Sequence, residues 1–255
     1  MVDSLLLGLM STYKSVGIYA AASKLNRILC IVIASVGNVL VPRISNLVSL
    51  GEAERAGAIL TKSMRISIAL TLPLAFGFFL LADQLVAIMY GVRFLDSVLI
   101  CRILAPIIII TGVSNVFTIQ LLLTHSRERE LFIVYLTGTL VTLIFNAVLI
   151  YYFDAPGAAV AMLFAEMFIC VVAWKLTKRV CTLPIPWGYL FSCLAFCTLF
   201  WPIVYFAKQW VGNVWAIVGI SFALCGSIYF VCQLIFYKSF ITEEIFSLLS
   251  RKQAD

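Results

Sequence analysis

The chain has 255 residues, of which 63% are hydrophobic and only 12% are charged, and its formal net charge is +6. Soluble domains are about 45–50% apolar and about 25% charged, so this composition and the mean hydropathy of +1.09 exclude a soluble globular protein. Only helices and closed barrels satisfy their backbone in lipid, and the apolar runs here are too continuous for barrel strands. The composition therefore predicts an all-α, polytopic helical membrane protein with several transmembrane helices.

The first apolar stretch, residues 5–10, is too short to cross a bilayer, since a spanning helix needs about 20 residues. The residues before it carry no positive side chain, so they do not form the basic region of a signal peptide. The stretch has the pattern of a helix end whose beginning is missing. We therefore expect a truncated chain, with Met1 not proven to be the natural start.

Seven longer apolar runs follow, and each is long enough to cross the roughly 30 Å hydrocarbon core. They cover residues 16–41, 67–89, 98–123, 131–153, 157–176, 187–207 and 213–237. We expect each run to form one transmembrane helix.

Basic residues are concentrated in alternate loops. The richer loops and the C-terminal tail carry Arg43, Arg55, Lys62, Arg65, Arg127, Arg129, Lys175, Lys178, Arg179, Lys238, Arg251 and Lys252. The opposite side carries only Lys14, Arg93, Arg102 and Lys208. By the positive-inside rule the richer side is the cytoplasm, so we expect a cytoplasmic C-terminus. The net positive charge is then a topology signal and requires no nucleic-acid partner.

Two charged segments have the pattern of short helices on the cytoplasmic membrane surface. They are residues 52–65 (EAERAGAILTKSMR) and residues 241–252, whose apolar side chains are spaced to face lipid. We expect both to lie along the interface and to serve orientation and solubility.

Lys24 and Arg27 lie one helical turn apart inside the first long apolar run. A helix that enters the membrane at Val16 places them about 12 Å and about 16 Å deep. A cation at such a depth costs on the order of 2.5–3.5 kcal/mol on insertion scales. The pair either lines a solvated cavity that attracts an anion, or it reaches the membrane surface or pairs with Glu166 or Asp3.

Other polar residues also lie inside apolar runs, where each is costly: Asn38, Asn115, Gln120, Asn146 and Glu166. The three asparagines are candidates for substrate contact, and their alternative role is hydrogen bonding between helices. Glu166 either balances a cation or carries a coupling ion such as a proton.

Metal and cofactor sites are not expected. Six of the eight cysteines lie inside apolar runs, where a thiol behaves as a small hydrophobe, and no CxxC motif is present. The single histidine, His125, borders a charged loop. We therefore predict no metal ligands, no cofactor and no disulfide framework.

An ordered set of segments resembles the Wzx-type polysaccharide or O-antigen flippases of the multidrug/oligosaccharidyl-lipid/polysaccharide (MOP) exporter superfamily. The segments are residues 3–8 (DSLLLG), 16–28 (VGIYAAASKLNRI), 39–45 (VLVPRIS), 90–94 (YGVRF), 101–123 (CRILAPIIIITGVSNVFTIQLLL) and 153–161 (FDAPGAAVA). The resemblance covers about residues 1–180. It implies a carrier with two six-helix lobes around a central cavity that opens to each side in turn.

The resemblance also implies a substrate, an undecaprenyl-pyrophosphate-linked oligosaccharide that crosses the bacterial inner membrane for surface polysaccharide biosynthesis. The implied substrate-binding residues are Lys24, Arg27, Asn38, Asn115 and Asn146, and Glu166 is the candidate for the coupling ion. Cationic side chains suit the phosphate oxygens. The chain is then a transporter and not an enzyme.

Within that family, residues 1–180 are expected to form the second, C-terminal lobe of a MATE/flippase-like fold, with a partial first helix and five full spans. Residues 181–240 add a further transmembrane helix pair, and residues 241–255 form a cytoplasmic tail. The expected partners are the lipid-linked oligosaccharide, membrane lipids, a missing N-terminal lobe or partner chain, and polysaccharide-assembly proteins.

Three other functions remain open. A MATE-like drug/cation antiporter of the same superfamily needs intramembrane carboxylates, whereas this chain is richer in deep bases. A membrane enzyme of envelope glycan synthesis needs a positioned acid or base or a metal, and no external loop is long enough to build such a site. A scaffold subunit requires only that the cations are paired.

Overall fold

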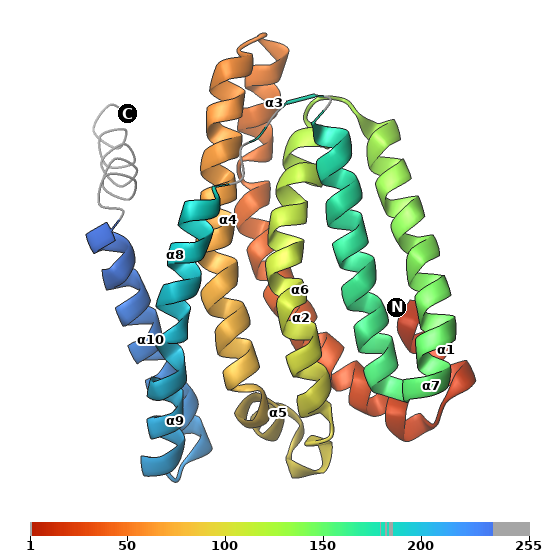
Figure 1. Ribbon diagram of the computed structural model, residues 1–255, viewed down its shortest axis with the longest axis vertical. Coiled ribbons are helices and arrows are strands. Elements are labelled where there is room, and N and C mark those ends of the chain that lie inside the picture. The colour runs from red at the N-terminus through yellow and green to blue at the C-terminus, as the bar shows by residue number, and fades with distance from the viewer. Residues whose placement is uncertain (1, 179, 182, 184–185, 237–255) are drawn as a thin grey trace. The chain divides into compact units, whose positions relative to one another are not determined.

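The computed structural model describes residues 2–178, 180–181, 183 and 186–236, and every regular element of this described part is a helix (Figure 1). Six helical segments are long and apolar enough to cross a membrane: Tyr13–Ser49, Ala53–Leu80, Ser97–Leu123, Glu128–Thr177, Trp187–Trp210 and Val214–Ile235. The predicted all-α, polytopic membrane fold is therefore confirmed. The chain forms two compact units, Met1–Leu194 and Ala195–Asp255.

The first unit begins with α1 (Val2–Met10), α2 (Tyr13–Asn38) and α3 (Val41–Ser49). Thr12 caps α2, since its Oγ1 accepts a hydrogen bond of 3.3 Å from the backbone N–H of Ser15. Pro42 lies at the start of α3, where a residue without a backbone N–H is tolerated. The expected span of residues 16–41 is thus one helix that ends at Asn38, and a second helix follows it.

Helices α4 (Ala53–Leu80) and α5 (Ala82–Tyr90) correct two expectations. The prediction of a separate interfacial helix at residues 52–65 is wrong, because these residues form the first turns of α4. The expected span of residues 67–89 is divided between α4 and α5. The buried side chains of α4 recur every three or four residues along its length: Ala56, Leu60, Met64, Ile68, Leu72, Ala75 and Phe78. This continuous buried face favours one unbroken helix.

The rest of this unit includes η1 (Val92–Phe94), α6 (Ser97–Asn115), the π-helix η2 (Val116–Leu123) and α7 (Glu128–Thr177). Helix α7 reverses its direction at Asp154, where φ is 53° and ψ is −132°, so its two limbs run side by side (Figure 1). Gly157 permits the reversal, since a Cβ there would lie 2.0 Å from the backbone oxygen of Leu149. The limbs correspond to the expected spans of residues 131–153 and 157–176.

Helix α6 is central to the first unit, where it packs against α2, α4 and α7. Leu104 and Ile108 of α6 are fully buried in the same apolar cluster as Tyr19 of α2 and Phe78 of α4. Lipid tails are as apolar as these side chains, so close van der Waals packing holds the helices together.

The two ends of this unit differ in the segments that they carry (Figure 1). Helix α3, the turn between η2 and α7, and the end of α7 lie at one end. The turn before α2, helix α5 and the reversal of α7 lie at the other end. The segments at the α3 end contain most of the basic residues of the richer loops, which agrees with the alternation that the sequence predicts.

The second unit contains the end of α8 (Trp187–Thr198), α9 (Phe200–Trp210) and α10 (Val214–Phe236). Helices α9 and α10 pack against each other, and the ring centroids of Phe200 and Tyr229 lie 6.2 Å apart. Helices α8 and α9 together cover the expected span of residues 187–207, and α10 covers most of residues 213–237. The expected interfacial helix at residues 241–252 and the tail at residues 241–255 lie outside the described residues.

Candidate functional site

An exposed stripe of α2 carries three of the predicted substrate-binding residues. It consists of Lys24, Arg27, Ile31, Ser35 and Asn38, which are all exposed and are separated by three or four residues. This spacing places them on one helix face, with Arg27 and Asn38 about 16 Å apart along the axis. We call these five residues the α2 stripe. Its two cations lie within an apolar membrane-length helix, where an unpaired charge is costly.

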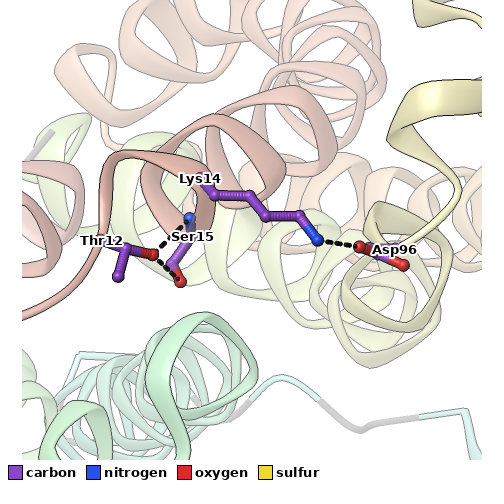
Figure 2. A network of polar contacts seen from close by, with 4 residues as sticks. All are labelled: Thr12, Lys14, Ser15 and Asp96. Atoms are coloured by element: carbon purple, nitrogen blue, oxygen red, sulfur yellow. Dashed lines mark hydrogen bonds and ion pairs between the residues drawn. The ribbon is translucent and has the colours of Figure 1, made fainter.

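Neither cation of the stripe forms an ion pair within the described part of the chain. Basic residues near helix ends behave differently. Lys14 Nζ lies 2.9 Å from Asp96 Oδ2, beside the Thr12 cap (Figure 2). The predicted alternative, in which Lys24 and Arg27 are neutralised by Glu166 or Asp3, is therefore not seen as an ion pair. The stripe remains positively charged and exposed.

A cavity of about 190 Å³ lies beside Arg27. Four segments supply its walls: α1, α2, α6 and the second limb of α7. Its polar lining includes Asp3, Tyr19, Asn26, Arg27, Thr111 and Glu166. We call it the Arg27 cavity. It brings together Arg27 and Glu166, two residues that the sequence singled out for different roles, whereas Lys24 does not line it.

Asn146 lies behind this cavity and contacts one of its walls. Its Nδ2 donates a hydrogen bond of 2.7 Å to Asp3 Oδ1, and both side chains are buried. The bond joins the first limb of α7 to α1, which is the helix-joining role that the sequence left open for this asparagine. Contact of Asn146 with substrate stays a prediction.

Asn115 lies at the far end of α2, near Asn38. Its Oδ1 accepts a hydrogen bond of 3.4 Å from Gln120 Nε2 in the π-helix η2. Both side chains lie close to the backbone of Gly37. A Cβ at this position would lie 2.5 Å from Gln120 Nε2 and 2.9 Å from Asn115 Oδ1, so only glycine fits without a shift of these groups. π-Helical turns are frequent at functional sites. Of the predicted residues, Arg27 and Glu166 thus line the Arg27 cavity, and Asn38 and Asn115 lie at this junction. Asn146 contacts the cavity wall through Asp3, and Lys24 lies on the α2 stripe outside the cavity.

Sequence reasoning missed Tyr19 and Asn26, each of which is only 1% exposed. The Tyr19 hydroxyl lies 3.5 Å from Met162 Sδ, to which it donates a weak hydrogen bond. Asn26 Oδ1 has no hydrogen-bond partner among the described residues. A signal was present, because Tyr19, Ser23 and Asn26 recur at four- and three-residue spacing and form a second polar face of α2. Arg27 lies between that face and the exposed side.

No group of three or more His, Cys, Asp or Glu side chains in the described part of the chain is arranged to hold a metal ion. All eight cysteines are free thiols.

A family model described as polysaccharide biosynthesis protein matches residues 1–99. The putative O-antigen transporter of Escherichia coli (strain K12) is 29% identical over 167 residues, which are 65% of this chain and 40% of that protein. The probable low-salt glycan biosynthesis flippase Agl15 of Haloferax volcanii is 25% identical over 162 residues, which are 63% of this chain and 34% of that protein. The chain thus spans well under half the length of both curated relatives.

Among solved structures, the chain is similar to the lipid II flippase MurJ in an inward closed conformation, with a TM-score of 0.81. The match covers 94% of this chain and 50% of that one, at 16% sequence identity. At this identity the likeness establishes a common fold, and it extends over nearly all of the described helices.

Proposed function

We propose that this chain is a member of the polysaccharide flippase family, and that it takes part in moving a lipid-linked oligosaccharide across a membrane without changing it chemically. The observation that carries the proposal is the exposed pair Lys24 and Arg27 on the α2 stripe, which forms no ion pair with any residue that the structure describes. An anionic ligand offsets the cost of placing two cations at this depth. The names of the two curated relatives, an O-antigen transporter and a glycan biosynthesis flippase, support a glycan as cargo.

The anionic part of the cargo in this proposal is the pyrophosphate of undecaprenyl pyrophosphate. The guanidinium of Arg27 presents its donors in a fork that matches phosphate oxygens, and the ammonium of Lys24 acts as a flexible point charge. Asn38 lies farther along α2, and Asn115 lies at the end of α6 beside Gly37; both contact the glycan or shape its path. Asn146 contributes by holding Asp3 in the wall of the Arg27 cavity.

Glu166 is the proposed coupling residue. It lines the same cavity as Arg27, so an ion bound at its carboxyl group changes the charge beside the substrate cation. A proton or a monovalent cation has this effect. Uptake and release of that ion then alternate with binding and release of the pyrophosphate.

We place the protein in the bacterial inner membrane, with the α3 end of the first unit and the C-terminus in the cytoplasm. The distribution of basic segments supports this orientation. In the proposed organisation, residues 1–180 form one transport lobe, residues 181–240 an added helix pair and residues 241–255 a tail. Because the chain aligns with half or less of each relative, the proposed substrate path includes a second lobe, in the same polypeptide or in a partner chain.

A second candidate function is a drug/cation antiporter, and one observation favours it. The carboxyl groups of Asp3 and Glu166 line one cavity, and carboxylates attract cationic compounds. The exposed Lys24 and Arg27 oppose it, because they repel a cation at the same site. Export of a cationic dye that survives Lys24→Ala and Arg27→Ala but is lost in Glu166→Gln would favour this second function.

The first test of the flippase proposal uses the double variant Lys24→Ala/Arg27→Ala in cells that depend on this protein. We expect normal membrane insertion and accumulation of lipid-linked glycan on the cytoplasmic leaflet. The matched control is Lys14→Ala/Arg93→Ala, which also removes two exposed cations but leaves the α2 stripe intact. Full export of the glycan by the stripe variant would contradict the proposal. An equal loss of export in both variants would show that removing any two exposed cations lowers export, and that the α2 stripe has no specific role.

A further inference from the structure

Two serines of α4 are buried, and their hydroxyl groups have no partner among the residues that the structure describes. Ser63 is 2% exposed and Ser67 is 8% exposed, and no hydrogen bond joins either Oγ to another described residue. Thr61 and Thr71 of the same helix differ, because they donate hydrogen bonds of 2.9 Å and 2.8 Å to backbone oxygens one turn earlier. Burial of a hydroxyl without a partner is costly, so an acceptor from outside the protein would stabilise this pair.

Both serines line one small cavity between α2 and α4. Its volume is about 120 Å³, and most of its walls are aliphatic side chains of these helices and of the segment between α2 and α3. Three of the lining residues, Val36, Val39 and Leu70, are exposed, so the cavity reaches the surface of the first unit. We call it the Ser63 cavity. It shares no lining residue with the Arg27 cavity.

The Ser63 cavity lies near one edge of the hydrocarbon core. Helix α4 ends at Leu80, and a core of about 30 Å corresponds to about 20 helical residues, so it reaches back to about residue 60. Ser63 then lies about 5 Å inside this edge. Lys62 and Arg65 are next to it in the sequence, which agrees with this level, since basic side chains extend to the membrane surface.

The ligand that matches this cavity combines an acceptor with an apolar chain. Sites for drug-sized ligands enclose about 300–1,000 Å³, so a cavity of about 120 Å³ holds one group of a molecule that extends outside it. Serine hydroxyls donate to a carbonyl oxygen, and aliphatic walls contact a hydrocarbon chain. No basic residue is among the described residues that line the cavity, so it does not favour a phosphate. The ester groups of phospholipids have the required composition, and they lie at the edge of the hydrocarbon core.

We propose that the Ser63 cavity binds an ester group of a membrane glycerophospholipid, in the leaflet at the α3 end of the first unit. Ser63 and Ser67 donate to the ester carbonyl oxygen. The attached acyl chain passes Val36, Val39 and Leu70 into the bilayer, and the phosphate head group stays at the membrane surface. The inference goes beyond the proposed function and does not depend on it, because the Ser63 cavity shares no residue with the α2 stripe.

The test compares ester-linked and ether-linked phosphatidylethanolamine of the same chain length, because the ether lipid lacks the carbonyl oxygen. The whole protein carries the photocrosslinking substitution Val39→p-benzoylphenylalanine and is placed in nanodiscs with equal amounts of both lipids and with undecaprenyl phosphate. After illumination, mass spectrometry identifies the lipid attached at this position. We expect attachment of the ester lipid about 3- to 10-fold more often than the ether lipid, as one or two hydrogen bonds would give.

Variants of the serines show whether their hydroxyls cause this preference. Ser63→Ala/Ser67→Ala should bring the ratio of ester to ether lipid close to one, while attachment continues because the aliphatic walls remain. The matched control is Ser45→Ala/Ser49→Ala, which removes two exposed hydroxyls of α3 outside the cavity and should keep the wild-type ratio. If the double variant does not fold, Ser63→Ala and Ser67→Ala alone should each lower the ratio. The same crosslinker at exposed Phe132, near the start of α7, should give a ratio close to one.

Three results would overturn the proposal. A ratio close to one at Val39 with both serines present would indicate that water or any hydrocarbon chain fills the cavity. A high ratio that survives both serine substitutions would show that the hydroxyls do not bind the ester. Attachment of undecaprenyl phosphate in place of both phospholipids would assign the cavity to a polyprenyl chain. None of these results alters the transport expected of Lys24→Ala/Arg27→Ala, so failure here is distinct from failure of the proposed function.

Discussion

Arg27 of α2 and Glu166 of the second limb of α7 line one cavity, yet no ion pair joins them in the described part of the chain. A guanidinium bound to a carboxylate has its donors occupied, whereas an unpaired one keeps them for a phosphate. In the proposed mechanism, the carboxyl group of Glu166 is likewise left for an ion. The proposed substrate site and the proposed coupling site are then close but separate.

Replacement of Glu166 with Gln should uncouple transport from the ion gradient, because the amide keeps the shape of the side chain but cannot take up a proton or hold a cation. We expect a loss of at least about tenfold in gradient-driven transport, which corresponds to about 1.4 kcal/mol of coupling. The measurement is glycan-lipid transport in vesicles with and without an imposed gradient. Glu128→Gln, at an exposed position near the start of α7, should behave as wild type, and equal rates for Glu166→Gln and wild type would exclude Glu166 from coupling.

Replacement of Gly37 with Ala should destabilise the junction at the end of α2. A Cβ there would lie 2.5 Å from Gln120 Nε2 and 2.9 Å from Asn115 Oδ1, so one of these side chains has to move. Overpacking of this kind costs about 1–3 kcal/mol, which we expect as a lower unfolding temperature in detergent. Gly57→Ala in α4 is the control, since nothing lies within 4 Å of its Cβ position. Equal stability of Gly37→Ala and wild type would contradict the close contact.

Replacement of Asn146 with Leu removes the donor that bonds Asp3 across 2.7 Å. We expect a loss of about 1–3 kcal/mol in the free energy of unfolding, because a buried polar contact is removed. Denaturant titration in micelles measures this loss. Asn38→Leu, at an exposed position, should change stability by less than about 0.5 kcal/mol. The opposite order of the two losses would show that Asn146 does not hold α1 against α7.

Removal of the exposed Lys14–Asp96 ion pair should have little effect on stability. The two side chains are 74% and 60% exposed, and pairs of this kind contribute about 0–1 kcal/mol. Lys14→Ala should therefore unfold within about 1 kcal/mol of wild type in the same titration. A larger loss would indicate that this pair holds α2 against the start of α6, and Lys14 would then be unsuitable as a control position.

The helices were largely predictable from the sequence, because apolar runs of membrane length leave few alternatives in lipid. The error at residues 52–65 has a specific cause. The charged residues of that segment are typical of a helix on the membrane surface. The buried face from Ala56 to Phe78 instead continues through the segment, so that residues 53–80 form one helix. The π-helix η2 was not predictable, since its altered hydrogen bonding leaves no clear mark in an apolar sequence.

The candidate site was predictable only in part. Lys24 and Arg27 are three positions apart in an apolar run, and this spacing is sufficient to predict that they share one helix face. The bond between Asp3 and Asn146 joins residues that are 143 positions apart, and no local pattern reports such a contact. Asn26 was not predicted, because the charged residues Lys24 and Arg27 nearby give the stronger sequence signal. Asn26 is only 1% exposed, and the sequence alone does not reveal this burial.

The most direct measurement reconstitutes the whole protein in liposomes with a fluorescent undecaprenyl-pyrophosphate glycan and follows its movement between leaflets. We expect rapid movement for the wild type and a loss of at least about tenfold, or about 1.4 kcal/mol, for Lys24→Ala/Arg27→Ala. Lys14→Ala/Arg93→Ala should move the lipid at the wild-type rate. Equal rates for the wild type and the Lys24→Ala/Arg27→Ala variant would contradict a substrate site on the α2 stripe.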